Sequence, residues 1–209
     1  MLSEQSPLLL ASASPRRREI LETLGVPVRV LPASVDETVR VGESPRDYLA
    51  RVVDDKLAAA SLLASDDPRA DGVAGVLVAD TSVIVDARIL GKPVDEADAR
   101  AMLRLLSGRA HEVWTRFALR SCAVGAPTFA ETVVTRVVFR ALDAGEIDGY
   151  AASGEGLDKA GAYAVQGLGA FAVARIEGSY ANVVGLPACE VVAALRRAGL
   201  IATFPLPGR

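Results

Sequence analysis

The stretch LLLASASPRRR, residues 8–18, decides how the fold begins. Its three leucines and the alanine after them predict a short buried strand. The serines that follow predict a turn into a helix, because Ser14 can cap a helix and the proline suits its first turn. Free N–H groups at the start of that helix, with nearby hydroxyls and guanidiniums, favour a polyphosphate. The side chains concerned are Ser12, Ser14, Arg16 and Arg17. The alternative is a solvated helix face that carries three arginines.

Helices and strands alternate after this stretch. Residues 28–31 predict a second strand, and a helix of about twenty residues is predicted from Pro45, because its apolar positions follow a 3.6-residue period. The other helices are predicted at residues 95–107, 143–152 and 187–198. The other strands are predicted at residues 73–79, 82–86, 111–122, 132–140 and 171–176, with a hairpin tip at residues 87–88. Strands cluster in the second half, so the order predicts an α/β fold with a mixed sheet.

Length and charge restrict the function. A chain of 209 residues suits one large domain or two small lobes around a cleft. The net charge of −3 argues against a non-specific nucleic-acid binder, which usually has a basic surface. The apolar run near the N-terminus is too short to span a bilayer, so a cytoplasmic protein without a membrane segment is expected.

The cysteines and the histidine of the sequence disfavour several kinds of metal site and active site. Cys122 and Cys189 form no CxxC pair, so two buried thiols in a reducing compartment are expected. A single histidine, His111, disfavours both a His/Cys zinc site and a Ser-His-Asp triad. His111 itself is expected to be structural. No GxxxxGK[ST] motif occurs, which disfavours a P-loop NTPase.

Two acidic residues could hold a metal ion. Asp80 ends the apolar strand at 73–79, and a carboxylate at the end of a buried strand needs a partner. A divalent cation or an attacking water would serve, although a cap or a salt bridge would serve as well. Glu37 could supply a second carboxylate, because magnesium is often held by one or two carboxylates and by substrate phosphates.

Further candidates could neutralise phosphate charge or contact a base. Lys56 lies in the long predicted helix, and Lys92 lies between a glycine and a proline. Residues 157–167 are rich in small side chains, which would let the backbone approach a flat ligand closely. Gln166 has both a donor and an acceptor and could pair with the edge of a base. The alternatives are solvated lysines and a structural set of turns.

Taken in order, these segments resemble the Maf family of nucleotide pyrophosphatases, also called septum-formation-inhibitor-like proteins. The matching pieces are LASASPRR (10–17), VDET (35–38), GESP (42–45), ADT (79–81), ILGKP (89–93), HEV (111–113), LDKAG (157–161), QG (166–167) and IEGSYANVVGLP (176–187). They cover nearly the whole chain. Arg116, Ser82 and Gly145 depart from the family's usual residues, and Arg116 could alter the rim of a cleft or a dimer contact.

The resemblance implies the mixed α/β fold of inosine triphosphate pyrophosphatases in a single domain, residues 1–209, with two lobes around a nucleotide cleft and often a homodimer. It implies hydrolysis of dTTP and UTP to monophosphate and pyrophosphate with Mg²⁺ or Mn²⁺, in the service of clean nucleotide pools. Asp80 would be the catalytic base or a metal ligand, assisted by Glu37. The implied substrate ligands are Ser12, Ser14, Arg16, Arg17, Lys56, Thr81, Lys92 and Gln166. The alternatives are a nucleotide-binding regulator of septum formation with little turnover, and a pyrophosphatase of inosine or methylated nucleotides.

Overall fold

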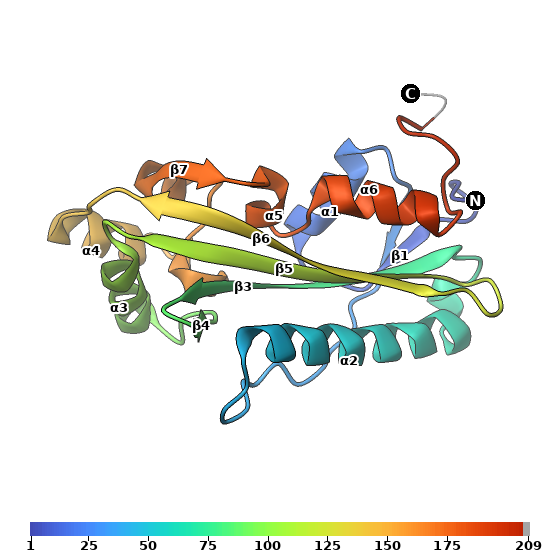
Figure 1. The fold of residues 1–209 in the computed structure, drawn as a ribbon, viewed down its shortest axis with the longest axis horizontal. Helices are drawn as coiled ribbons and strands as arrows, with labels where there is room; N and C mark the ends of the chain where they lie inside the picture. The colour runs from blue at the N-terminus through green and yellow to red at the C-terminus, as the bar shows by residue number, and fades with distance from the viewer. Residues whose placement is uncertain (207–209) are drawn as a thin grey trace. The chain divides into compact units, whose positions relative to one another are not determined.

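The computed structural model describes residues 1–206, which form two compact units. The first unit comprises Met1–Asp80, Arg116–Thr132 and the chain from Gly185 onward. The second comprises Thr81–Thr115 and Val133–Val184. Three long strands have residues in both units (Figure 1): β3 (Gly75–Val85), β5 (Ala110–Ser121) and β6 (Thr128–Phe139).

Within residues 1–206 the sheet has seven strands, and its parallel part lies in the first unit. In this unit β1 (Leu8–Leu10) lies between β2 (Val28–Val30) and β3 and runs parallel to both. The strand order is β2-β1-β3-β5-β6-β7, where β7 is Val173–Glu177, and β4 (Arg88–Leu90) pairs with β3. Antiparallel pairing joins β3 to β4 and β6 to β7, so the sheet is mixed. The predicted mixed-sheet α/β fold is confirmed.

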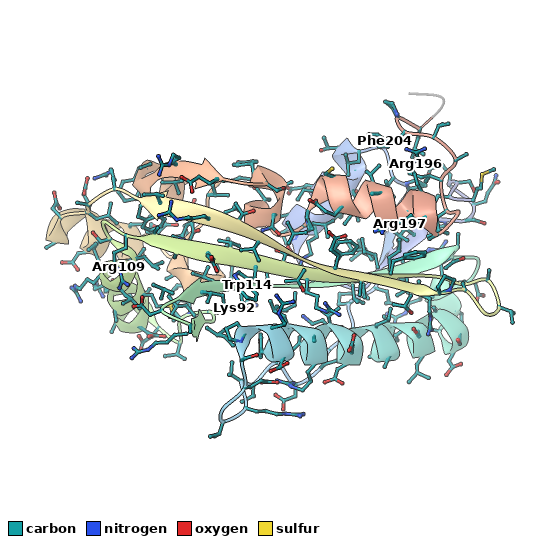
Figure 2. The ribbon with its side chains drawn as sticks, in the orientation of Figure 1. Lys92, Arg109, Trp114, Arg196, Arg197 and Phe204 are labelled. Carbon is teal, nitrogen blue, oxygen red and sulfur yellow. The ribbon has the colours of Figure 1, made fainter. Side chains whose placement is uncertain are left out.

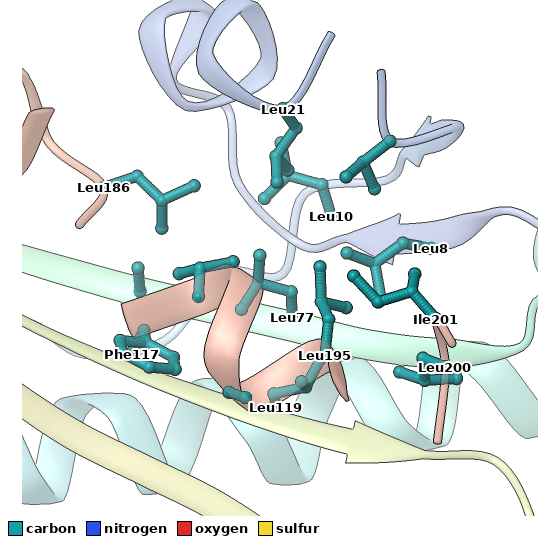
Figure 3. Close-up of a cluster of buried hydrophobic side chains, with 14 residues drawn as sticks. Leu8, Leu10, Leu21, Leu77, Phe117, Leu119, Leu186, Leu195, Leu200 and Ile201 are labelled. Carbon is teal, nitrogen blue, oxygen red and sulfur yellow. The ribbon is translucent and has the colours of Figure 1, made fainter. Parts of the chain in front are cut away.

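Helices cover both faces of the sheet in the first unit. These helices are α1 (Pro15–Thr23), α2 (Pro45–Asp66), the short η1 (Pro68–Ala70) and α6 (Ala188–Arg197). Leu8 and Leu10 point into one apolar cluster with α1 and α6, which Figure 3 shows. Leu9 points the other way, into a cluster with α2. Burial on both faces explains why this parallel strand is an unbroken apolar run, since successive side chains of a strand alternate between faces.

The second unit has its own apolar core. Its remaining elements are β4 (Arg88–Leu90), α3 (Glu96–Leu106), α4 (Ala144–Ala152), η2 (Ala160–Ala162), η3 (Leu168–Ala172), β7 (Val173–Glu177) and α5 (Tyr180–Val184). Helix α4 forms although Gly145 and Gly149 weaken it. Asp143 and Glu146 build a capping box at its start, which satisfies two backbone N–H groups that the helix cannot pair itself.

Several local predictions needed correction. The strands predicted at 73–79 and 82–86 form one strand, β3, because Asp80 stays within the ladder. The hairpin tip lies at Asp86 and Ala87, one residue earlier than predicted, and both have positive φ as a two-residue turn requires. Both cysteines are exposed rather than buried. No helix within residues 1–206 is long and apolar enough to cross a membrane.

Candidate functional site

Successive side chains of β3 alternate between the two faces of the sheet, and this alternation determines the face on which Asp80 lies. Val76 and Val78 face α2, so Asp80, two residues further on, is placed on the same face. On α2, Lys56 lies among the buried residues of the same helix side, three positions after Val53. The side chains meet: Lys56 Nζ donates to Asp80 Oδ1 at 2.7 Å, and both side chains are at most 10% exposed.

Glu37 reaches the same ammonium group from a loop. Its Oε1 lies 2.6 Å from Lys56 Nζ, while its side chain stays 47% exposed. Two carboxylates from segments far apart in the sequence therefore share one buried cation. We call Glu37, Lys56 and Asp80 the carboxylate–lysine cluster. The convergence of Glu37 and Asp80 that a common site requires is present in the structure.

Residues of α2 that the sequence did not single out hold the loop that carries Glu37. The Tyr48 hydroxyl donates to the Glu37 carbonyl at 3.1 Å. Arg51 grips Glu43 with two nitrogens, at 2.7 and 2.9 Å, and donates to the Thr38 carbonyl at 2.9 Å. The Arg51 hydrogen bonds are the main reason that the pKa of Glu43 falls to about 2. The sequence indicates this role of Tyr48 and Arg51 only weakly, through their spacing of three residues, which places them on one side of the helix.

Arg17 joins three segments of the first unit. Its Nε donates to the Gly185 carbonyl at 2.9 Å, and one terminal nitrogen donates to Ser12 Oγ and to the Ala79 carbonyl at 3.1 and 2.8 Å. Burial lowers the pKa of this guanidinium, against the opposing pull of Asp80 and Glu37. Arg17 therefore holds the backbone next to Asp80 and the Ser12 loop in register.

Ser14 and Arg16 lie at the start of α1 and are only partly buried. Ser14 is the N-cap residue of α1, but its side chain makes no capping bond, so the predicted side-chain cap is wrong. Its backbone N–H donates to Ser12 Oγ at 3.2 Å instead. Arg16 is half-buried on the first turn of α1. The structure thus brings together Ser12, Arg17, Glu37, Lys56 and Asp80, with Ser14 beside Ser12.

The other three predicted site residues belong to the second unit. Thr81 shares a hydrogen bond of 2.9 Å with the Thr115 hydroxyl. Lys92, which is labelled in Figure 2, is exposed, and Gln166 is exposed as well. The Gly161 N–H donates to the Gly91 carbonyl at 3.0 Å. This hydrogen bond links the backbone next to Lys92 to residues 157–167, the segment that is rich in small side chains.

Glycines in and just after that segment serve close packing within the protein. Gly161 has φ +70°, and a Cβ there would meet the Val83 side chain at 2.9 Å. A Cβ on Gly169 would meet the Tyr150 hydroxyl at 2.5 Å. Of these two glycines, only Gly161 lies in residues 157–167, for which the sequence predicted close approach of a flat ligand. Strand β3 already occupies the space beside Gly161, so packing within the protein accounts for that glycine.

His111 is a core residue, as predicted. It is 3% exposed, shares a hydrogen bond of 2.8 Å with the Tyr163 hydroxyl and packs edge-on against Phe139. Burial lowers its pKa to about 4, so the ring is neutral at physiological pH. Arg116, the departure noted above, donates to the Thr132 hydroxyl on the neighbouring strand at 3.2 Å.

The donor set of the first unit suits a hard cation held in part by its substrate. Within residues 1–206 no three His, Cys, Asp or Glu side chains gather as a ready-made metal cage. The carboxylate–lysine cluster offers two carboxylates close to one point. Magnesium is commonly bound by one or two carboxylates with phosphate oxygens and waters completing the shell, so the residues present fit such an ion.

Comparison with known proteins decides the family. The model of the Maf-like protein family matches residues 7–198. The chain belongs to this family. The predicted Maf resemblance is thereby confirmed. The chain is 51% identical to the dTTP/UTP pyrophosphatase of Myxococcus xanthus strain DK1622, over 100% of this chain and 99% of that one.

Other Maf-like relatives have the same name. The dTTP/UTP pyrophosphatases of Anaeromyxobacter dehalogenans strain 2CP-1 and Methylococcus capsulatus strain Bath are 49% and 47% identical, over 96% of this chain in each case. Among solved structures, a HAM1 protein from Coxiella burnetii aligns with 64% of this chain and 73% of its own, at 14% identity and a TM-score of 0.40. A likeness at that level carries no argument about this Maf-like chain.

Proposed function

We propose that this Maf-like chain hydrolyses dTTP and UTP to the nucleoside monophosphate and pyrophosphate. The observation that carries the proposal is the sharing of the Lys56 ammonium by Glu37 and Asp80, at 2.6 and 2.7 Å. Relatives about half identical over almost their full length have the name dTTP/UTP pyrophosphatase, which supports the choice of substrate.

The chemistry assigned to the chain is attack of water on the α-phosphorus. Asp80 accepts a proton from the water, the bond from the α-phosphorus to the bridging oxygen breaks, and pyrophosphate leaves. Lys56 donates a hydrogen bond to Asp80 and so keeps that carboxylate oriented. Glu37 and Asp80 are the proposed ligands of Mg²⁺ or Mn²⁺, which when bound would neutralise charge on the triphosphate.

Substrate contacts complete the proposal. Around the carboxylate–lysine cluster, the proposed phosphate ligands are Ser12, Ser14, Arg16 and Arg17. In the second unit, Lys92 is proposed to contact phosphate, and Thr81 and Gln166 are proposed to select the base. We further propose that residues 1–209, the last three of which lie outside the described residues, act as one cytoplasmic domain. Pairing into a homodimer stays a prediction.

A substrate panel tests the function. The purified chain is incubated with dTTP, UTP, CTP, GTP, dITP or 7-methyl-GTP and with Mg²⁺ or Mn²⁺, and pyrophosphate release is measured. We expect dTTP and UTP to be hydrolysed fastest and EDTA to abolish turnover. Fast release from dITP or 7-methyl-GTP alone would overturn the substrate assignment. Tight binding of dTTP without pyrophosphate release would favour the nucleotide-binding regulator instead.

A further inference from the structure

One carboxylate in the second unit holds two backbone amides next to Gln166. Glu155 Oε1 accepts the Leu168 N–H at 2.9 Å, and Glu155 Oε2 accepts the Gly169 N–H at 2.8 Å. A carboxylate that accepts from two backbone N–H groups forms charge-assisted hydrogen bonds, which are about twice as strong as neutral ones. The chain that follows Gln166 is therefore anchored at two successive residues.

The chain that precedes Gln166 is anchored by the same network. The Ala164 N–H donates to the Tyr150 hydroxyl at 3.1 Å, and that hydroxyl donates to Glu155 Oε2 at 2.9 Å. Tyr150 is a buried residue of helix α4. Glu155 is thus linked, directly or through Tyr150, to the backbone on both sides of residues 165–167.

The conformation of Gly167 depends on this arrangement. Gly167 has φ +82° and ψ −147°, a region that only glycine adopts readily, and a Cβ there would collide with the Glu155 carboxylate. Gln166 itself is exposed. Hydrogen bonds to the backbone on both sides of Gln166 can keep its side chain in place although the side chain is exposed. Recognition of the edge of a base requires such an accessible side chain in a fixed position.

We propose that Glu155, together with Tyr150, is a positioning residue that sets base selectivity by fixing the backbone on both sides of Gln166. The inference rests on the proposed function, because it takes Gln166 as the residue that selects the base. Glu155 touches neither substrate nor reacting atoms in this account. It acts through the segment 164–169, so its loss changes which base is accepted more than how fast the phosphate is cleaved.

A double-mutant cycle tests this role. Glu155→Gln, Gln166→Ala and the double variant are compared with the wild type, and kcat/KM is measured for UTP and for CTP. Glutamine keeps the size of the side chain but offers one acceptor oxygen in place of two. We expect the UTP-to-CTP ratio to fall about tenfold in each single variant and no further in the double variant. Equal loss with both nucleotides in Glu155→Gln, or losses that multiply in the double variant, would overturn the proposal.

Glu146→Gln is the matched control. Glu146 is a carboxylate in the same unit that pairs with Arg140 and caps α4, and its hydrogen bonds do not reach residues 164–169. It should lower the melting temperature while leaving the UTP-to-CTP ratio unchanged. Hydrogen exchange adds a second readout, since the Leu168 and Gly169 amides should lose protection in Glu155→Gln and keep it in Glu146→Gln.

The outcomes separate this inference from the proposed function. A wild type that hydrolyses UTP selectively, with Glu155→Gln equally selective, would overturn only the role of Glu155. A wild type that releases no pyrophosphate from dTTP or UTP would overturn the proposed function. In that case the same cycle is read from the binding constants of UTP and CTP, and binding of neither nucleotide would overturn the inference as well.

Discussion

The carboxylate–lysine cluster and the segment around Gln166 are organised in opposite ways. In the cluster, charged side chains contact each other directly, and Lys56 is almost fully buried between Glu37 and Asp80. Around Gln166, the proposed functional side chain is exposed, and the support comes from a carboxylate bound to the neighbouring backbone amides.

The difference follows from what each region has to do. Phosphoryl chemistry needs charges at fixed distances, and burial strengthens such contacts because the local dielectric is low. Recognition of a base needs an accessible hydrogen-bond donor and acceptor in a fixed place. The side chain that supplies them cannot be fixed by its own burial, so the neighbouring backbone has to be held instead. The following variants test the carboxylate–lysine cluster, the loop that carries Glu37 and the buried core of the second unit.

The largest effect is expected from Asp80→Asn. The amide keeps the shape but cannot accept the proton of water, so kcat should fall about a thousandfold. Pyrophosphate release with dTTP measures the loss, and circular dichroism checks that the fold is intact. Asp54→Asn, an exposed residue of α2, is the matched control and should retain full activity. Near-normal turnover of Asp80→Asn would remove this residue from its proposed role.

Lys56→Met tests whether the cluster depends on its central cation. Removing the ammonium leaves the buried Asp80 carboxylate without its partner, so the free energy of unfolding should fall by about 3 kcal/mol. Urea denaturation measures it. Adding Asp80→Asn should restore part of the loss, because the unpaired charge is then gone. Lys92→Met, at an exposed position of the second unit, should change stability by less than about 0.5 kcal/mol. Similar losses for both lysines would contradict the contrast.

Acid should weaken the second unit through His111. The pKa of this buried ring is lowered to about 4 from 6.5, so the unfolded chain takes up the proton first as pH falls. The stability that the neutral ring contributes is complete above pH 6.5 and is lost as pH falls toward 4, by roughly 2–3 kcal/mol. Urea denaturation between pH 7 and 4 should show a smaller decline for His111→Gln, which does not titrate. Parallel pH profiles of the two proteins would exclude His111 as the cause.

The smallest effect is expected from Arg51→Lys. Lysine cannot grip Glu43 with two nitrogens, so the loop that carries Glu37 should become less well held. We expect kcat/KM for dTTP to fall about tenfold and the Mg²⁺ concentration for half-maximal activity to rise, because Glu37 is a proposed metal ligand. Arg69→Lys, which alters an exposed pair with Asp67, should change neither quantity. An unchanged Mg²⁺ requirement in Arg51→Lys would separate this loop from metal binding.

Many local features could be predicted from the sequence. The leucine run 8–10 and the 3.6-residue spacing of α2 predicted buried elements, because burial follows the period of each backbone. The ordered motifs also predicted the Maf-like family and pointed to Glu37, Lys56 and Asp80. Two failures were local as well: Asp80 continues a strand that it was expected to end, and Ser14 occupies the cap position without bonding through its side chain.

What the sequence by itself determined is therefore the type of most of the longer elements and which face of each is apolar, since both depend on residues within a few positions of each other. Only the tertiary structure decided that Glu37 and Asp80 meet on Lys56, that Arg17 donates to Ala79 and Gly185, and that Glu155 holds the amides beyond Gln166. Contacts of this kind join segments far apart in the chain. They exist because packing of the whole unit sets those distances, and no local pattern records them.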